Sequence, residues 1–564
     1  MTLEKIANQV VDTDMLVIGG GIAGAPAAVK AAESGLNVTL VDKSKVDRSG
    51  SAAQGIDHYA GAFPKGMSPQ DWVDACMKIG NGGWRGLYYN AVGYIDMTLL
   101  YRLAANGMWA IEELDRMGIT MRWDDGEIRP IRSVRKIPFI RVHWQNVKPE
   151  LAGALKKAGV NVLNRVMIVD LLKDSAGRVT GATAINTRTG DFIVIRAKIT
   201  VLATAACSRV YNPETPIPGK YKFRYHWCPA SVSGDGWGMG FRAGAEMANM
   251  EQAGRGFRPR DDSCFPIGNQ NNEGSRGKYF TADGEEFAIP KPPLLEELER
   301  TGRDPFYVSI QHLSDDFHKR VEVDYVDERM ISMKIAQDRG FDPRTHWFEM
   351  IDNRPNQLHT EPGIQTNAYF ETNLPGLYAI GDCVSGQHDV ANAATAGCLM
   401  GEAASDCVKG VPDPAVDEAQ VEMLKEATMR PLNTSDGEEP MELELTIRHI
   451  CNRYIGTATG EGRLKEAIRR LDSIKREFLN KMVAQNPHYL MRALEVRNLF
   501  DVAEMHAKAT LERRETRDAQ VRLDCPEPDP KLEGMILHQK LMDGEIVHEF
   551  RKLPPLDMTL KEDR

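Results

Sequence analysis

The stretch LHTEPGIQTN, residues 358–367, contains a histidine whose surroundings could support chemistry. His359 stands between an apolar leucine and a Thr-Glu-Pro-Gly turn, and Gly-Ile-x-Thr-Asn closes the stretch. A histidine in such a setting has three interpretations: a packed core side chain, a metal ligand, or a group that holds a substrate. No histidine or cysteine accompanies it at metal-ligand spacing, which disfavours the metal. The choice between the other two depends on the rest of the chain.

A second set of residues has the spacing that binds a phosphate. Gly19, Gly21 and Gly24 form a GxGxxG pattern, and Asp42 follows eighteen residues after the last glycine. In such a pattern the first glycine allows a tight turn and the second lets a pyrophosphate approach the backbone, while the third lets a helix pack closely on a strand. An acid at the position of Asp42 can accept a hydrogen bond from a ribose hydroxyl.

The elements around these glycines decide between nucleotide binding and a purely structural turn. Residues 15–18 form a short apolar strand, an alanine-rich helical segment follows the glycines, and residues 38–41 form a second strand that ends at Asp42. The helix N-terminus presents free N–H groups and a partial positive charge to a phosphate. Because strand, glycines, helix and acid occur in the expected order, the pattern predicts nucleotide binding.

The remainder of the chain predicts further domains. Residues 161–206 alternate strand-like and turn-like segments and predict a small β-meander. LPGLYAIGDC, residues 374–383, returns to a strand followed by glycine, and apolar residues beyond about 430 recur at helical spacing. The predicted domains are a first nucleotide-binding part at 1–214, an inserted domain at 215–345, a second nucleotide-binding part at 346–430, a helical domain at 431–545 and a C-terminal tail at 546–564.

Composition excludes several classes of protein. At 564 residues the chain is too long for one hydrophobic core, and its 42% apolar and 27% charged residues are ordinary for a soluble globular protein. The net charge of -10 gives no basic face for nucleic acid. No run of eighteen apolar residues predicts direct membrane insertion, and the N-terminus MTLEKIANQVVDTD lacks the features of a secretory signal. We therefore expect a cytoplasmic protein, with membrane association through partners left open.

The nine cysteines are scattered, with no CxxC pair. An odd, dispersed set argues against a disulfide scaffold. It also disfavours an iron–sulfur cluster or a zinc site built by this chain alone, because such sites carry closely spaced ligands. We therefore expect no metal site in this chain.

The order of these parts resembles the fumarate reductase/succinate dehydrogenase flavoprotein family, which includes the α subunit of adenylylsulfate reductase. The resemblance extends over residues 12–530. It implies an α/β fold class: a Rossmann-type FAD-binding domain with an inserted α+β capping domain and a C-terminal helical domain. It also implies FAD as cofactor, and a hetero-oligomer in which a separate, ferredoxin-like iron–sulfur subunit exchanges the electrons.

The same resemblance implies how the flavin is held. RSGSAAQGI, residues 48–56, is similar to the family's flavin loop, but Gly50 and Ser51 stand where some members carry a histidine bonded to FAD, so non-covalent FAD is expected. Asp382 in AIGDC matches the acid that holds the ribityl chain, and a helix starting near Thr395 would point its N-terminus at the flavin ring. The other cofactor positions predicted in this way are Lys43, Ser49, Gln54, Gly55, Ala203, Gly381 and Asn392.

Three segments resemble the catalytic part of the family. NEGSRGKYF places Glu273 in a proton-delivery path, and TGRDPFYVSI places Arg303 as the proton-donating acid. An arginine acts as an acid only if it is desolvated and coupled to a proton relay, so a structural salt bridge is the alternative for Arg303. The match of LHTEPGIQTN to the family's H-x-x-x-G-G-I segment favours His359 as a substrate-binding residue over a core histidine. ATLERRETRDAQVRLDCPEPD, residues 509–529, is similar to the family's closing motif.

The sequence departs from the dicarboxylate-specific members in two places. EQAGRGFRPRDDSCF, residues 251–265, lacks their second histidine, and DVANAATAGC, residues 389–398, keeps Asn392 without their arginine. Arg258 or Arg260 could replace these partners of a substrate anion. GIDHYAGAF, residues 55–63, in turn lacks the asparagine that adenylylsulfate reductases place against the flavin.

These observations leave three functions open. The leading hypothesis is hydride transfer between flavin N5 and an activated C=C bond, as in fumarate reductases and succinate dehydrogenases. The second is an adenylylsulfate reductase-like reaction at sulfur. The third is an electron-relay flavoprotein that has no small substrate of its own.

Overall fold

The computed structural model describes most of the chain. The described residues are 2–54, 56–60, 68, 70–71, 95–122, 125–131, 139–144, 146–211, 229–253, 257–259, 277–287, 292–316, 318–319, 338–340, 342, 344–352, 358, 361–387, 389–456, 458–517 and 520–559.

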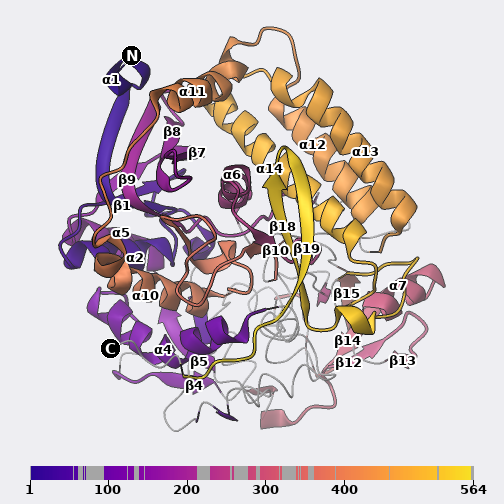
Figure 1. The fold of residues 1–564 in the computed structure, drawn as a ribbon. Coiled ribbons are helices and arrows are strands. Elements are labelled where there is room, and N and C mark those ends of the chain that lie inside the picture. Colours follow the sequence, from indigo (N-terminus) through magenta and orange to yellow (C-terminus); the bar gives the residue numbers. More distant parts are fainter. Residues whose placement is uncertain are drawn as a thin grey trace.

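A seven-stranded sheet forms the centre of the largest domain (Figure 1). Its parallel strands are β6 (Asn161–Asn164), β2 (Val38–Asp42), β1 (Gln9–Ile18), β9 (Phe192–Leu202) and β17 (Leu377–Ala379), and its antiparallel strands are β7 (Val166–Lys173) and β8 (Val179–Asn186). The inner strands are mostly buried because both faces of the sheet are covered, and β1 ends in the buried apolar run Met15–Ile18. The predicted strands at 15–18 and 38–41 and the predicted meander are confirmed.

Two helices, α2 (Gly24–Glu33) and α10 (Val390–Val408), pack on each other against this sheet. The contact is close because α10 presents glycines to α2. A Cβ atom on Gly397 would lie 2.2 Å from the carbonyl oxygen of Ala23, and one on Gly401 would lie 2.6 Å from that of Ala27. The first half of α10 is thereby held beside the beginning of α2, where the glycine loop ends.

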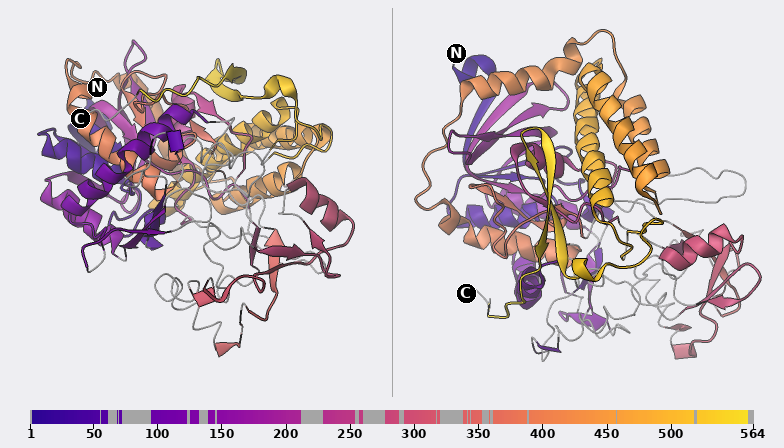
Figure 2. Two further views of the ribbon diagram at one scale, coloured as in Figure 1. Left: turned by 90° about the horizontal axis from the view of Figure 1, so that it is seen from below. Right: turned by 45° about the vertical axis from the view of Figure 1, so that its right-hand side comes forward.

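A smaller domain, the cap, extends away from the main sheet (Figures 1 and 2). Its five-stranded sheet has the order β11-β15-β14-β12-β13 and carries helix α7 (Pro292–Arg300). The strands are β11 (Phe257–Pro259), β12 (Lys278–Phe280), β13 (Glu286–Phe287), β14 (Phe306–Ser309) and β15 (Phe348–Asp352). The cap has its own core, which includes Tyr279, Leu298 and Phe306. The predicted inserted domain at 215–345 stops short of β15, which completes the cap sheet.

The chain enters the cap at one strand and leaves it from the neighbouring strand. It leaves the main core at Ala253 and enters β11, and it returns from β15 to Leu358, which is again buried in the main core. β11 and β15 are antiparallel partners, with Phe257 opposite Asp352. Both crossings therefore begin side by side at one edge of the cap sheet.

The helical domain lies beside the main sheet (Figure 1). Its helices are α11 (Glu418–Asn433), α12 (Pro440–Ile450), the π-helical turn η4 (Cys451–Ile455), α13 (Glu461–Glu477) and α14 (Pro487–Glu512). The long helix α14 is buried along most of its length and packs against α6 (Asp235–Ala243) of the main domain. The predicted α/β fold class, with an inserted α+β domain and a C-terminal helical domain, is confirmed.

The C-terminal region differs from the prediction of a helical domain to 545 followed by a tail. β18 (Met535–Met542) and β19 (Glu545–Lys552) form a hairpin, and β18 also pairs with β10 (Met247–Ala248). Asp543 and Gly544 join the strands with φ angles of 51° and 83°, as a type I′ turn requires. This Asp-Gly pair between alternating apolar residues was the signal that the prediction overlooked.

The remaining elements complete the fold. They are α1 (Leu3–Ile6), η1 (Ser51–Gln54), β3 (Ile56–Ala60), α4 (Met97–Arg116), β4 (Arg129–Ile131), β5 (Phe139–Trp144), α5 (Val147–Lys157), β16 (Gly363–Ile364), η3 (Gly381–Cys383), η5 (Leu479–Lys481) and η6 (Pro530–Leu532).

A buried ion cluster joins the helical domain to the main domain. Glu495 of α14 accepts hydrogen bonds from Lys43 (2.6 Å), Arg209 (2.7 Å) and Arg492 (2.5 Å). Its side chain is 2% exposed. Burial alone would raise the pKa of Glu495, but the three cations outweigh burial and lower the pKa to about 2. Glu444 of α12 extends the cluster through ion pairs with Arg209 and Arg492.

We expect Glu495→Gln to lower the free energy of unfolding by about 3–5 kcal/mol at pH 7, because three neighbouring cations of a largely buried cluster would lose the carboxylate that they share. The measurement is urea unfolding followed by circular dichroism. Glu466→Gln is the control, since Glu466 pairs with Arg469 and Arg470 on the surface of α13, where solvent screens the charges and the loss of stability should be small.

The pH dependence gives a second check on Glu495. Its pKa is about 2 in the folded chain against an ordinary value of 4.5, so its contribution is complete above pH 4.5 and is lost as the pH falls towards 2. The difference between the parent and Glu495→Gln should therefore shrink below pH 4.5. A difference that is small at pH 7, or constant with pH, would contradict the role of the cluster.

Candidate functional site

A pocket opens at the carboxyl ends of β1, β2 and β9 of the main sheet, the edge at which α/β folds bind ligands. Its wall includes residues 18–23, 41–44, 49–52, 166–168, 203–205, 231–232, 235, 239, 380–382 and 393. Nine of the predicted cofactor residues lie in this wall: Gly19, Gly21, Asp42, Lys43, Ser49, Gly50, Ala203, Gly381 and Asp382. Gly24 lies directly behind it, and Asn392 is a buried neighbour of Ala393. Gln54 ends the turn η1, and Gly55 lies outside the described residues.

The three glycines of the loop are required for different reasons. A Cβ atom on Gly19, whose φ is +107°, would lie 2.3 Å from the carbonyl oxygen of Ala203. One on Gly24 would lie 1.9 Å from the carbonyl oxygen of Gly19. A Cβ atom on Gly21 would meet no atom of the described residues within 4 Å. Gly19 and Gly24 thus serve the packing of the chain, whereas Gly21 leaves room in the pocket for a ligand.

Asp42 connects two of the loops that line the pocket. Its carboxylate accepts from the Gly20 N–H (3.0 Å), the Ser49 hydroxyl (2.6 Å) and the Ser44 N–H (2.8 Å). A carboxylate has about four acceptor positions, so three of them already serve the protein. Hydrogen bonding of Asp42 to a ribose stays a prediction, but its structural part in the pocket is clear.

The ammonium group of Lys43 is fully hydrogen-bonded to other protein groups. Its ammonium donates to Ser233 (2.8 Å), Asp235 (2.7 Å) and Glu495 (2.6 Å), which uses all three of its N–H donors. Burial opposes the charge, yet the two carboxylates raise the pKa of Lys43 above its ordinary value. The predicted cofactor contact would require one of these bonds to break, so in this arrangement Lys43 shapes the wall of the pocket.

Asp382 is the polar group in the pocket wall that most needs a ligand. Its Oδ1 atom is buried and has no hydrogen-bond partner among the residues that the structure describes. Burial, with the neighbouring Asp389 carboxylate as a lesser cause, raises the pKa of Asp382 to about 7. The preceding Gly381 is fixed by its N–H, which donates to Gln387 at 2.7 Å. A hydroxyl group of a bound ligand would satisfy the carboxylate.

Helix α10 begins five residues earlier than predicted, at Val390 and not near Thr395. Asp389 ends the loop after Asp382 and caps the helix by accepting from the Ala391 N–H (3.4 Å). The helix starts beside the pocket, and Ala393 of its first turn lies in the wall. The positive end of the helix is thereby available to negative charge in the pocket, and its direction towards the flavin ring stays a prediction.

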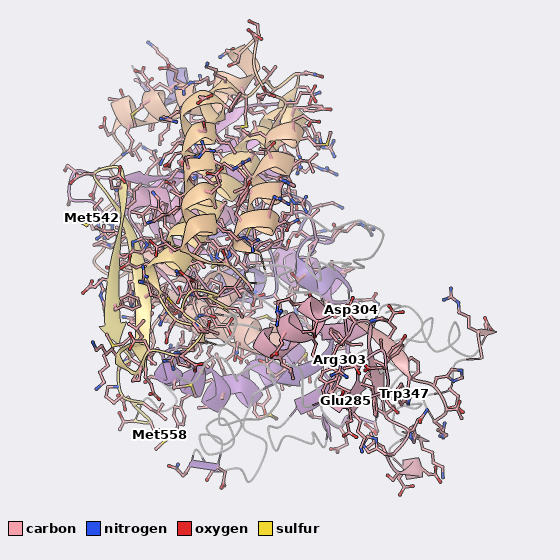
Figure 3. The ribbon with its side chains drawn as sticks, turned by 90° about the vertical axis from the view of Figure 1, so that its right-hand side faces the viewer. Glu285, Arg303, Asp304, Trp347, Met542 and Met558 are labelled. Carbon is pink, nitrogen blue, oxygen red and sulfur yellow. The ribbon has the colours of Figure 1, made fainter. Side chains whose placement is uncertain are left out.

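Arg303 lies in the cap and not in the wall of this pocket (Figure 3). Its guanidinium pairs with Asp283 (2.9 Å) and with Glu285, both from the turn between β12 and β13. These carboxylates raise the pKa of Arg303, which opposes the loss of a proton. This arrangement favours the structural alternative for Arg303, and its role as the proton donor stays a prediction.

Of the other predicted catalytic residues, only Arg258 belongs to the described part of the chain. His359, Glu273 and Arg260 lie outside the described residues, and Arg258 is described by its backbone in β11, opposite Ile351 of β15.

The neighbours of His359 are held by the loops that line the pocket. Leu358 is fully buried and exchanges two backbone hydrogen bonds with Cys207, at 2.9 and 3.1 Å. Cys207 follows the wall residues 203–205. Two residues after His359, the carbonyl oxygen of Glu361 accepts from the Ser385 hydroxyl at 2.6 Å, just beyond Asp382. The described residues on either side, Leu358 and Glu361, are thus each held by a segment that adjoins the wall of the pocket.

One charged residue close to the pocket was not found by sequence reasoning. Lys148, in the first turn of α5, is 2% exposed and donates to the Gly20 carbonyl. No local pattern identifies it, because its partner is 128 residues away along the chain.

The described parts of the chain contain neither a candidate membrane span nor a candidate metal site. No helix there is long and apolar enough to span a membrane. Nor does any group of three or more His, Cys, Asp or Glu side chains there have the arrangement of a metal site.

Comparison with known proteins identifies the family. The model of an FAD binding domain matches residues 14–399, and that of the fumarate reductase flavoprotein C-terminal region matches residues 444–549. L-aspartate oxidase of Yersinia pestis is 26% identical over 93% of this chain and 98% of its own. The fumarate reductase flavoprotein of Escherichia coli K12 is 24% identical over 92% of this chain and 90% of its own. Adenylylsulfate reductase of Archaeoglobus fulgidus has the same fold, with a TM-score of 0.80 at 23% identity over 97% of both chains.

The chain therefore belongs to the FAD-dependent oxidoreductases of the fumarate reductase flavoprotein family. FAD is its cofactor, as the sequence predicted. The pocket fits this cofactor on two observations: the space in front of Gly21 suits a pyrophosphate, and the unpartnered Asp382 oxygen suits a ribityl hydroxyl.

Substitution of two glycines should separate cofactor binding from folding. Gly21→Ala should leave the thermal stability of the FAD-free chain unchanged but weaken FAD binding about 100-fold, because the new methyl group enters only the ligand's space. Gly24→Ala should lower the stability itself, because its methyl group meets a backbone oxygen. Thermal unfolding without FAD and quenching of flavin fluorescence measure the two effects. Equal losses of stability in both variants would contradict this assignment.

Asp382→Asn should make the FAD-free chain more stable and weaken its binding of FAD. The pKa of Asp382 is raised from 3.8 to about 7, so its ionisation favours unfolding progressively from pH 3.8 to 7 and by a constant amount above. The variant should therefore be more stable than the parent by up to about 4 kcal/mol at pH 8 and by much less at pH 4.

The same variant should bind FAD more weakly at pH 8, because a neutral amide oxygen accepts a weaker hydrogen bond than a carboxylate. Urea unfolding of the FAD-free chain at both pH values and FAD titration provide the measurements. A variant that is less stable than the parent at pH 8, or that binds FAD equally well, would contradict the role of Asp382.

Proposed function

We propose that this chain is a flavoprotein subunit that exchanges hydride between flavin N5 and an activated C=C bond in a small anionic substrate. FAD, bound non-covalently because its loop carries Gly50 and Ser51 in place of a histidine, supplies the two-electron transfer. A separate iron–sulfur protein exchanges the electrons. The segments NEGSRGKYF and TGRDPFYVSI, which resemble the catalytic part of the family, support this reaction. Relatives that are named fumarate reductases support it too.

The observation that carries the proposal is the position of the two chain crossings between the domains. Arg258 lies in β11, immediately after the chain leaves the main core, and His359 follows β15, where the chain returns. Because β11 and β15 are paired, with Arg258 opposite Ile351, Arg258 lies in the strand next to the one that leads along the chain to Leu358 and Glu361. Leu358 and Glu361 attach the second segment to the wall of the FAD pocket. A substrate held at this junction would lie next to the cofactor.

The chemistry assigned to these residues follows from their types. His359 binds a carboxylate or carbonyl oxygen of the substrate and stabilises the negative charge that develops on it. Arg258 or Arg260 pairs with the remaining anionic group and replaces the histidine and arginine that this chain lacks. Glu273 belongs to the path that delivers the proton to the neighbouring carbon. Arg303 completes that path only if its two carboxylate partners release it.

A second candidate, an adenylylsulfate reductase-like reaction, rests on different observations. The flavin loop has the length of the adenylylsulfate reductase version, and both dicarboxylate partners are replaced. Arg258 and Arg260 would then bind a sulfate or phosphate group, which arginine recognises as well as a carboxylate.

A single assay separates these functions. The purified protein is mixed with reduced viologen and then with a panel of unsaturated mono- and dicarboxylates and adenylylsulfate. In a separate reaction, sulfite and AMP are supplied with an oxidised electron acceptor in place of the reduced viologen. We expect oxidation of viologen with at least one unsaturated carboxylate, and loss of that turnover in the Gly21→Ala variant, which serves as the blank. Turnover with adenylylsulfate alone would select the second candidate. A chain that reoxidises only through another protein would be an electron relay.

A further inference from the structure

The glycine loop is held from below by a buried ammonium group. Lys148 of α5 is 2% exposed, and its Nζ atom donates to the carbonyl oxygen of Gly20. The opposite side of Gly20 is held too, since its N–H donates to Asp42 at 3.0 Å. Both polar groups of this residue are therefore fixed by charged side chains from elements far apart in the sequence.

The position of the Gly20 carbonyl determines where the next N–H points. In a trans peptide the C=O and the following N–H point in opposite directions. Since the Gly20 carbonyl points at Lys148, the Gly21 N–H points away from it. Among the described residues this N–H donates to no acceptor, and Gly21 faces the open part of the pocket.

The ammonium group also brings a positive charge close to the pocket. The charged groups that act on it are the carboxylates of Asp42 and Asp47, and no hydrogen bond joins Lys148 to either of them. Burial lowers the pKa of Lys148 to about 8, although both carboxylates oppose this shift. A buried cation with one backbone acceptor is costly unless an anion binds nearby.

We propose that Lys148 is a positioning residue for the diphosphate of FAD. Its ammonium fixes the Gly20 carbonyl so that the Gly21 N–H faces the diphosphate, and its charge partly neutralises the diphosphate from behind the loop. This inference rests on FAD binding and not on the substrate proposed above, so the failure of one leaves the other intact.

The test measures FAD binding to the full-length FAD-free chain by isothermal titration calorimetry, without any substrate. Lys148→Met should bind FAD about 10- to 100-fold more weakly at pH 7, the loss typical of one charge-assisted contact. Lys148→Arg keeps the charge and should recover part of this affinity. Lys173→Met is the matched control, because Lys173 also donates to a backbone carbonyl, that of Ala243 at 2.7 Å, but at the far end of β7.

Proton uptake provides a readout that a merely structural lysine would not change. Burial lowers the pKa of Lys148 to about 8, so part of its population is deprotonated at pH 8.5 before FAD binds, and the bound diphosphate should reprotonate it. Titrations in buffers of different ionisation enthalpy should therefore show the parent taking up a fraction of a proton and Lys148→Met taking up none. Asp382 does not interfere, since with a pKa of about 7 it is already ionised at this pH.

Two outcomes would overturn the proposal. One is a Lys148→Met variant that binds FAD as tightly as the parent. The other is a parent protein that takes up no proton at pH 8.5, and this measurement decides the question even if the methionine variant does not fold. Weaker binding in Lys173→Met to the same degree would also count against a specific role.

Discussion

The carboxylate of Glu495 is the interaction on which the rest of the structure depends. It receives one cation from the end of β2, one from the segment after β9 and one from its own helix. The first of these, Lys43, also holds Asp235, which lies in the wall of the cofactor pocket, and Ser233, which follows the wall residue Val232. The helical domain therefore supports the pocket through Glu495, although it contributes no residue to the described wall. The pocket and that domain depend on each other because the charges are buried together.

Sequence reasoning succeeded where the relevant residues are close together in the chain. The glycine loop, both its strands and the helix between them occupy residues 9–42, so their spacing alone predicts how they fold. Asp382 was found through the resemblance of AIGDC to the family's flavin segment. The fold class was implied by the same resemblance, which rests on the order of the segments. The C-terminal hairpin was equally readable, through Asp543 and Gly544, but was assigned to a helical domain and a tail.

The sequence could not show which charged residues meet across long separations. Lys43 follows the second strand and suggested a cofactor contact, but its partner Glu495 is 452 residues away. Lys148 belongs to no motif, yet it holds the centre of the glycine loop. Arg303 was taken from a family motif, and two acidic residues of a neighbouring turn occupy it. In each case tertiary packing chooses the partner of a long, flexible cation, and no local pattern records that choice.

The unpaired oxygen of Asp382 has a consequence for the life of the protein in the cell. An unsatisfied buried polar atom costs about 1–3 kcal/mol, and a hydroxyl of the cofactor removes this cost. Newly made chains without cofactor are therefore the fraction most exposed to proteases. The amount of intact protein in a cell should follow the supply of riboflavin. A shortage of this vitamin then lowers the amount of the protein chain itself and not only the fraction that carries FAD.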